Sequence, residues 1–244
     1  MFRLIIVGLT VILFFILSII TLPLAWLIGC FSKTAKDYFS YFLVTKTFYL
    51  VRLLSGTKVD IIGLENVPKN QPVLFVGNHR SYFDIILNYS ILPPLMGFVS
   101  KIEIKKVPIL AQWMVNMNCL FLDRSSPKEG LKMIHDGVEK LQNGISIFIF
   151  PEGTRAKSDD TMAEFKGGSL KMAEKANVPI VPVAINNTSA IFENQFPFIK
   201  KAHVIIEYCE PIMTDNLSKE DKKFLAERVH DIVQGKVLDH MKGL

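Results

Sequence analysis

The sequence predicts an α/β fold with a mixed central sheet covered by helices, preceded by a membrane-embedded helix and an interfacial aromatic helix. Three observations predict this fold. Arg3 is the only charged residue before Lys33, and from Lys58 onward short β-branched runs alternate with amphipathic stretches. Several of these runs are continuously apolar, which is typical of strands covered on both faces. We expect a membrane-anchoring segment over residues 1–55 and an α/β domain over residues 56–244.

The composition excludes several classes of protein. The 244 residues carry a net charge of +5 and are half apolar, so the chain is not a disordered one. Its three cysteines, Cys30, Cys119 and Cys209, are too few and too widely spaced for a disulfide scaffold. Without a Cys-x-x-Cys pair or two histidines at helical spacing, we predict no metal site. A positive charge suits nucleic acid or an anionic membrane, and the mean hydropathy of +0.30 favours the membrane.

The first element is a long apolar run over residues 4–32. About 20 apolar residues suffice for a helix to cross a bilayer, so this run can span one, and Pro23 predicts a bend in it. One alternative is a buried core helix. Another is a cleaved signal, since residues 27–30 resemble a lipoprotein processing site ending at Cys30, although apolar cores of signal peptides are only about 7–15 residues long.

The next element is a segment rich in aromatic and basic residues. More positive charges follow the apolar run than precede it, so the positive-inside rule predicts that the bulk of the chain is cytoplasmic. Aromatic rings between lysines suit the headgroup level of a membrane, although a helix that packs on the domain would also use them. The aromatic residues are Tyr38, Phe39, Tyr41, Phe42, Phe48 and Tyr49, and the basic ones are Lys33, Lys36, Lys46 and Arg52.

The remaining elements alternate between strands and helices. One helix between residues 122 and 145 is well marked, because Ser126 can cap it, Pro127 suits its first turn and Glu129 completes a capping box. Two more helices are predicted over residues 168–176 and 219–240. The predicted strands are residues 59–62, 72–76, 97–100, 120–123, 145–150, 180–185 and 204–208.

A histidine and an aspartate follow the second predicted strand. His79 and Asp84 lie across a strand-to-helix turn, where the carboxylate can hold one tautomer of the imidazole and leave the other ring nitrogen free as a general base. The alternative is a structural hydrogen bond at a helix start. No serine lies in a Gly-x-Ser-x-Gly elbow, so a serine hydrolase is not indicated.

Other polar residues stand where further strands end. Residues 152–155, Glu-Gly-Thr-Arg, follow the apolar strand 145–150, and their glycine, hydroxyl and guanidinium suit a phosphate ligand. Lys101 and Arg124 also stand at strand ends, where α/β proteins bind their ligands. Taken singly, these features could equally be a polar turn and solvated surface charges.

The blocks taken together resemble the glycerolipid acyltransferase family, closest to its 1-acyl-glycerol-3-phosphate (lysophosphatidic acid) acyltransferases. The resemblance covers about residues 59–211, and a membrane-bound N-terminus is also typical of the family. Arg80 departs from the family pattern, since bacterial members often have glutamine there, and Asn116 or Asn118 replaces a small residue. The matching segments are residues 78–84, 101–104 with Pro108, 123–124, 150–155 and 178–183.

The resemblance implies a reaction and a set of site residues. His79, oriented by Asp84, would deprotonate the sn-2 hydroxyl of lysophosphatidic acid, which would then attack the thioester of acyl-CoA or acyl carrier protein without an acyl-enzyme. The product would be phosphatidic acid for phospholipid synthesis, and no cofactor is implied. The implied substrate-binding residues are Arg80, Ser81, Lys101, Arg124, Glu152, Gly153, Thr154 and Arg155, among which Arg124, Lys101 and Arg155 would hold the acceptor phosphate.

The resemblance also implies partners and a location. Besides the acyl donor and lysophosphatidic acid, the partners would be membrane lipids and not nucleic acid. Both thioester donors are cytosolic, which agrees with a catalytic domain on the cytoplasmic side of a membrane and argues against an exported lipoprotein. Alternatives are transfer to another lysophospholipid or to glycerol 3-phosphate, whose enzymes tend to have a second glycine at position 154. A third alternative is a membrane-anchored lipid-binding protein that has lost its catalytic activity. The intact residues that speak against it are His79, Asp84, Glu152 and Arg155.

Overall fold

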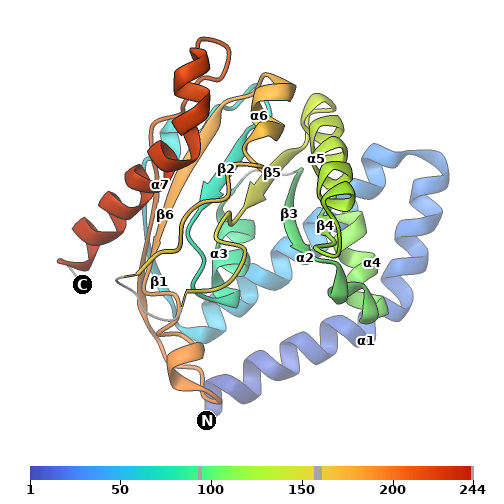
Figure 1. The fold of residues 1–244 in the computed structure, drawn as a ribbon. Helices are drawn as coiled ribbons and strands as arrows, with labels where there is room; N and C mark the ends of the chain where they lie inside the picture. Colours follow the sequence, from blue (N-terminus) through green and yellow to red (C-terminus); the bar gives the residue numbers. More distant parts are fainter. Residues whose placement is uncertain (93–94, 157–160, 243–244) are drawn as a thin grey trace.

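A seven-stranded sheet forms the centre of the protein (Figure 1). The computed structural model describes residues 1–92, 95–156 and 161–242. All seven predicted strands form, with ends shifted by a few residues from those expected. They are β1 Lys58–Ile62, β2 Leu74–Gly77, β3 Met96–Lys101, β4 Leu120–Leu122, β5 Ser146–Ile149, β6 Ile180–Asn186 and β7 His203–Tyr208.

The sheet is mixed, as predicted. Its strand order is β1-β7-β6-β2-β5-β3-β4, and every neighbouring pair is parallel except β6 and β7. The five parallel strands β6, β2, β5, β3 and β4 therefore end at one edge of the sheet. In α/β proteins this carboxyl edge is where ligands bind. All the predicted site residues follow β2, β3, β4 or β5 at this edge or end one of these strands.

Helices cover both faces of the sheet because alternate residues of its strands face opposite cores. In β2, Phe75 packs with α3 and α4, whereas Leu74 and Val76 pack with α5, α6 and α7. Ser126 caps α5 as predicted, but α6 begins three residues later than expected, since residues 167–170 form a turn. The helices are α3 Tyr82–Ile91, α4 Pro108–Asn116, α5 Pro127–Gln142, α6 Lys171–Ala176 and α7 Lys219–Met241.

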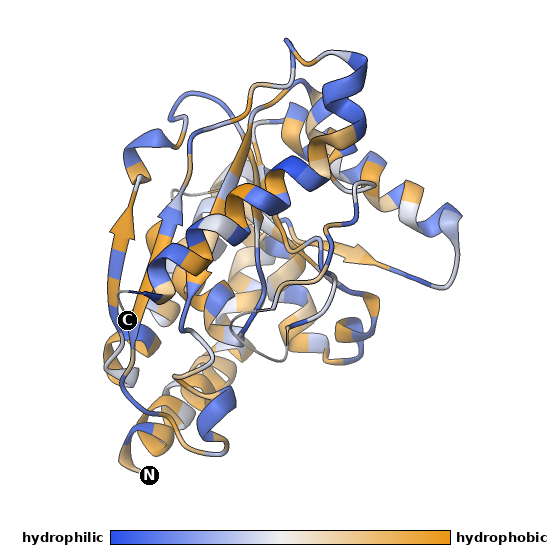
Figure 2. Cartoon of the chain, turned by 60° about the vertical axis from the view of Figure 1, so that its left-hand side comes forward, coloured by the Kyte–Doolittle hydropathy of each residue, from blue (hydrophilic) through white to orange (hydrophobic). Residues whose placement is uncertain are grey.

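Two long helices, α1 Phe2–Phe31 and α2 Lys33–Ser55, form a hairpin at the N-terminus. Within the described ranges, α1 is the one helix long and apolar enough to cross a membrane. It contains Pro23, and its ribbon changes direction along its length in Figure 1. Figure 2 shows the N-terminal region mainly in the colour of hydrophobic residues. Many of these side chains are exposed, among them Phe2, Ile19, Ile20, Trp26 and Phe31.

The hairpin also packs against the α/β domain. Trp113 of α4 donates a hydrogen bond to the Ser18 hydroxyl at 2.8 Å, and its ring lies 5.3 Å from that of Phe14. In α2, Tyr41 is buried in the same core as α3, whereas Tyr38 is exposed. The aromatic residues of α2 are thus divided between the core and the surface. Residues 1–55 share a core with the rest of the chain, and their separate anchoring role stays a prediction.

Candidate active site

The turn after β2 is held in place by one buried side chain. Asn78 donates to the carbonyl of Ile185 at 2.8 Å and accepts from the amide of the same residue at 2.8 Å. These two bonds tie the end of β2 to β6. Ser81 then caps α3 by accepting from the amide of Phe83 at 3.0 Å. The backbone between Asn78 and Ser81 is therefore fixed at both ends.

His79 and Asp84 lie in direct contact across this turn. His79 Nδ1 is 2.7 Å from Asp84 Oδ2, and the Asp84 side chain is completely buried. The same oxygen accepts from the amides of Arg80 at 2.6 Å and Ser81 at 2.8 Å. The other oxygen, Oδ1, accepts from the Thr188 hydroxyl at 2.5 Å. Four donors thus fix the carboxylate, which in turn orients the imidazole.

The second nitrogen of the His79 ring is the one left for chemistry. Because the Asp84 carboxylate accepts from Nδ1, the neutral ring has Nε2 as its unprotonated nitrogen. The ring stacks on Phe150, with centroids 4.1 Å apart and planes within 8°, and its side chain is 17% exposed. A base held in this way can accept a proton from a substrate hydroxyl.

Two predicted substrate-binding residues, Glu152 and Arg80, are buried at this turn. Glu152 is buried, and its two oxygens accept from the amides of His79 at 2.7 Å and Ala163 at 3.1 Å. Burial raises the pKa of Glu152, and these hydrogen bonds oppose the shift. Arg80 is also buried and donates to the carbonyl of Thr161 at 2.8 Å. Both side chains contact protein here, and direct contact with substrate stays a prediction.

Arg155 and Ser81 are brought together by a residue that the sequence analysis missed. Glu193 accepts from Ser81 Oγ at 2.6 Å, from the amide of Tyr82 at 2.9 Å and from Arg155 Nη1 at 3.1 Å. The Arg155 guanidinium also lies over the Tyr82 ring, 4.2 Å from its centroid. An ion pair and a cation–π contact therefore hold Arg155 beside the start of α3.

Arg124 belongs to a second basic group. Its Nη2 donates to the carbonyl of Gly153 at 2.6 Å. Gly153 has a φ of 72°, and a Cβ there would lie 2.8 Å from Arg124 Nη2 and 3.7 Å from Lys166 Nζ, so the position requires glycine. In the described ranges, Arg124 and Lys166 form no ion pair with a carboxylate.

Lys101 and Thr154 are both exposed at the same edge of the sheet. Lys101 ends β3, which lies between β5 and β4, and Thr154 follows Gly153 in the turn after β5. The three cations predicted to hold a phosphate thus have separate surroundings, since Arg155 pairs with Glu193 and Arg124 with Gly153. Among the described residues, no cluster of His, Cys, Asp and Glu could hold a metal ion.

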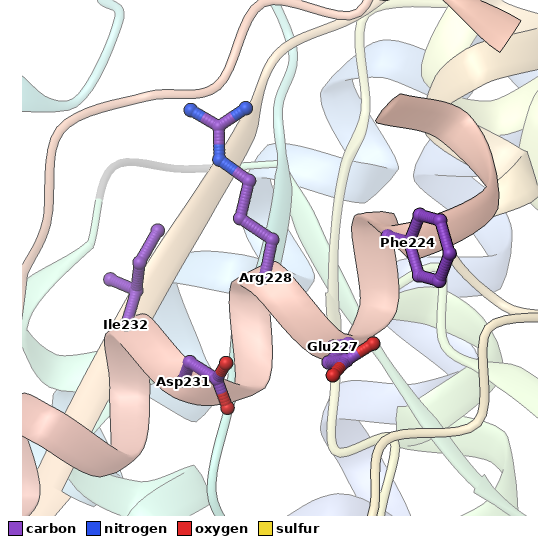
Figure 3. A pocket seen from close by; sticks show the side chains of 5 residues that line it. All are labelled: Phe224, Glu227, Arg228, Asp231 and Ile232. Carbon is purple, nitrogen blue, oxygen red and sulfur yellow. The ribbon is translucent and has the colours of Figure 1, made fainter. Parts of the chain in front are cut away.

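A hollow elsewhere on the surface has none of these features. Figure 3 shows it on the outer side of α7. None of the predicted site residues lines it, and its acidic and basic side chains come from one helix. It is therefore not a candidate active site. Its lining residues are Phe224, Glu227, Arg228, Asp231 and Ile232.

Three residues of the site were missed by the sequence analysis. Thr188 could have been suspected, because it follows β6 at the same edge as His79. Lys166 precedes a pair of glycines, which could have marked its loop as a ligand-binding one. Glu193 lies in a short 3₁₀ turn, Glu193–Gln195, and has no local sequence signal.

Comparison with known proteins places this chain in a family. The family described as Acyltransferase matches residues 58–186, more than half of the chain and every strand except β7. The chain belongs to the acyltransferase family. It is 33% identical over 199 residues to a 1-acyl-sn-glycerol-3-phosphate acyltransferase of Saccharomyces cerevisiae, covering 80% of this chain and 65% of the relative.

Further relatives of this acyltransferase agree in fold and sequence. A 1-acyl-sn-glycerol-3-phosphate acyltransferase of Borreliella burgdorferi is 31% identical over 75% of this chain and 73% of its own length. The chain thus spans about two thirds to three quarters of these two relatives. The crystal structure of the lysophosphatidic acid acyltransferase PlsC from Thermotoga maritima has a TM-score of 0.76 at 24% identity, covering 97% of each chain, and shows the same fold.

Proposed function

We propose that this acyltransferase is a 1-acylglycerol-3-phosphate O-acyltransferase. It transfers a fatty acyl group from acyl-CoA or acyl carrier protein to the sn-2 hydroxyl of lysophosphatidic acid and so makes phosphatidic acid. The observation that carries the proposal is the contact of His79 with the buried Asp84, which leaves Nε2 free at the edge where Lys101, Arg124 and Arg155 stand. The two relatives from Saccharomyces cerevisiae and Borreliella burgdorferi are named for this acceptor, which supports the choice.

In the proposed mechanism, His79 acts first as a base and then as an acid. Nε2 takes the proton of the acceptor hydroxyl, and Asp84 stabilises the imidazolium that forms. The hydroxyl oxygen attacks the thioester carbonyl, the C–S bond breaks, and the departing thiolate takes the proton back from His79. A cysteine acyl-enzyme is not supported, because burial raises the pKa of Cys209 to about 11 and also raises that of Cys119.

The basic residues at the sheet edge are proposed to hold the acceptor phosphate. A phosphate ester is best bound by several N–H donors, and Arg offers two of them in one plane. Arg124, Lys101 and Arg155 supply such donors from the ends of β4, β3 and β5, and Gly153 and Thr154 precede Arg155 in the turn after β5. Arg155 can donate to a phosphate while it keeps its ion pair with Glu193, or after that ion pair has broken.

One assay tests the reaction and its alternatives. The purified chain is incubated with radiolabelled acyl-CoA or acyl carrier protein and either lysophosphatidic acid, other lysophospholipids or glycerol 3-phosphate. Fastest turnover of lysophosphatidic acid is expected. Faster turnover of another acceptor would replace the proposed substrate. Binding of lysolipid without any turnover would identify a catalytically inactive, lipid-binding member of the family.

Replacement of Arg155 by lysine is expected to raise the KM for lysophosphatidic acid about tenfold, with the KM for the donor nearly unchanged. Lysine keeps the charge but cannot form the planar pair of donors that suits a phosphate. Steady-state kinetics with each substrate varied in turn would measure both constants. Arg228→Lys, in the hollow on α7, is the matched control and should change neither. A selective rise in the donor KM would instead assign Arg155 to the phosphates of the donor.

We further propose that residues 1–55 anchor the protein in a membrane and that residues 56–244 carry the reaction on its cytoplasmic side. The exposed apolar side chains of α1 support the anchor. The lysines and arginine that follow α1 support the orientation. The cytosolic acyl donors of the proposed reaction agree with it.

Deletion of residues 1–32 is expected to weaken membrane association without abolishing it. Aromatic and basic residues of α2 remain, so the residual binding should be reduced by salt. Turnover of a short-chain, soluble lysolipid should survive better than turnover of long-chain substrate in vesicles, because His79 and Asp84 lie outside the deleted segment. Vesicle flotation and the two assays measure these effects.

The fold of the truncated chain must be checked, since the deletion also removes the Ser18 and Phe14 contacts of Trp113. Circular dichroism provides this check. Equal loss of both activities in a folded truncated chain would mean that the N-terminal segment forms part of the active site.

A further inference from the structure

The connection between β6 and β7 exposes two phenylalanines and two lysines. Phe196 is 74% exposed and Phe198 is 43% exposed. Lys200 and Lys201 follow them and are also exposed. We call residues 196–201 the aromatic loop. The proposed reaction gives this loop no role.

The exposure of these rings is imposed by the fold of the loop. Ile199, between Phe198 and Lys200, is 6% exposed and packs in the core. The amide of Lys200 donates to the carbonyl of Ile191 at 3.0 Å, and that of Phe198 to Gln195 at 2.7 Å. The buried Ile199 and these two backbone hydrogen bonds therefore hold Phe196 and Phe198 at the surface, where the Phe196 ring has an edge contact with Phe192, with centroids 5.6 Å apart.

The aromatic loop lies beside the start of the candidate membrane helix. A Cβ on Gly56 would be 3.1 Å from Arg3 Nε and 3.3 Å from Lys201 Cβ, so the two basic residues meet at this glycine. Figure 1 shows the connection that precedes β7 next to the N-terminus of α1. Phe2, at the start of α1, is 75% exposed. The exposed rings of the loop thus lie within a few residues of its contact with the start of α1.

We propose that the aromatic loop is a second membrane contact, in which Phe196 and Phe198 enter the boundary between headgroups and acyl chains. Phe is among the apolar residues with which interfacial segments enter this boundary, and Lys200 and Lys201 are placed to meet anionic headgroups. The position of the loop beside the start of α1 favours a bilayer over a protein partner. The inference rests on α1 lying in the leaflet that faces the α/β domain, because a helix that crossed the membrane would carry Arg3 to the opposite side from Lys201. It is independent of the reaction proposed above.

The contact would bring the active site to the surface of the leaflet. Glu193 precedes the aromatic loop by three residues and contacts Ser81, Tyr82 and Arg155. The loop and the His79–Asp84 pair follow parallel strands at the same edge of the sheet. A lipid in the leaflet under the loop would therefore lie close to Arg155.

A fluorescent label at position 196 tests the contact in the full chain. Cys30, the exposed cysteine, is first replaced by serine, and Cys119 and Cys209 are buried. Phe196→Cys is then labelled with an environment-sensitive NBD dye and reconstituted into vesicles that contain phosphatidylglycerol. Phe224→Cys, at the 47% exposed Phe224 on α7, is the matched control. Quenching by lipids with a nitroxide on the acyl chain should be several-fold greater at 196 than at 224.

Lysine replacements and cross-linking complete the test. Lys200→Glu with Lys201→Glu should lower the quenching at 196 in vesicles with phosphatidylglycerol but not in vesicles of phosphatidylcholine alone. Equal quenching at 196 and 224 would overturn the proposal. If it were accompanied by efficient cross-linking between cysteines at 196 in two copies, the loop would instead be an interface between copies of this chain.

Discussion

Replacement of His79 by alanine is expected to lower kcat for acyl transfer by about 10²–10⁴, the usual contribution of a general base. The chain should stay folded and bound to the membrane. The His79 side chain is partly exposed, and besides its bond to Asp84 its ring stacks on Phe150. Asp84 would keep its other three donors, from Arg80, Ser81 and Thr188, so the turn before α3 remains supported.

Single-turnover kinetics of purified protein would measure this loss, and added imidazole should restore part of the rate if the missing group is a base. His135→Ala replaces an exposed histidine on α5 and should leave the rate unchanged. A purified His79→Ala enzyme with a rate within a few fold of the unaltered one would disprove the general-base mechanism.

The fold could be predicted largely because the strands carry their own signal. The continuous apolar runs of β2, β5 and β6 are covered on both faces, and each predicted run became a strand. The packing of the N-terminal hairpin was not predictable. Its contact depends on Ser18 and Trp113, which are 95 residues apart, and Ser18 gives no local indication of its partner.

The contact between His79 and Asp84 could be predicted because it is local, whereas its surroundings are not. His79 and Asp84 are five residues apart at a capped helix start, so their contact follows from the turn itself. Thr188 and Glu193 reach this turn from 104 and 112 residues away, through the pairing of β6 with β2. Composition and spacing carry no information on contacts of this kind.

Replacement of Asp84 by asparagine is expected to lower kcat about 100-fold or more by removing a charge without removing the turn. Oδ2 accepts from the His79 ring and from the amides of Arg80 and Ser81, so the carbonyl oxygen of asparagine must take this place. The new amide group then faces the Thr188 hydroxyl, which can rotate to accept from it. Nδ1 of His79 stays the protonated nitrogen, but the imidazolium formed during the reaction loses its counter-charge.

Thr188→Val tests the orientation of the Asp84 carboxylate separately from its charge, because it removes one hydrogen bond of Asp84 and keeps the carboxylate. We expect this variant to lose about tenfold or less in kcat, with circular dichroism and thermal unfolding used to show that both variants are folded. If Thr188→Val lost as much activity as Asp84→Asn, the carboxylate would serve to hold the imidazole in place. A much larger loss in Asp84→Asn would show that its negative charge stabilises the protonated His79 while the acceptor oxygen attacks the thioester.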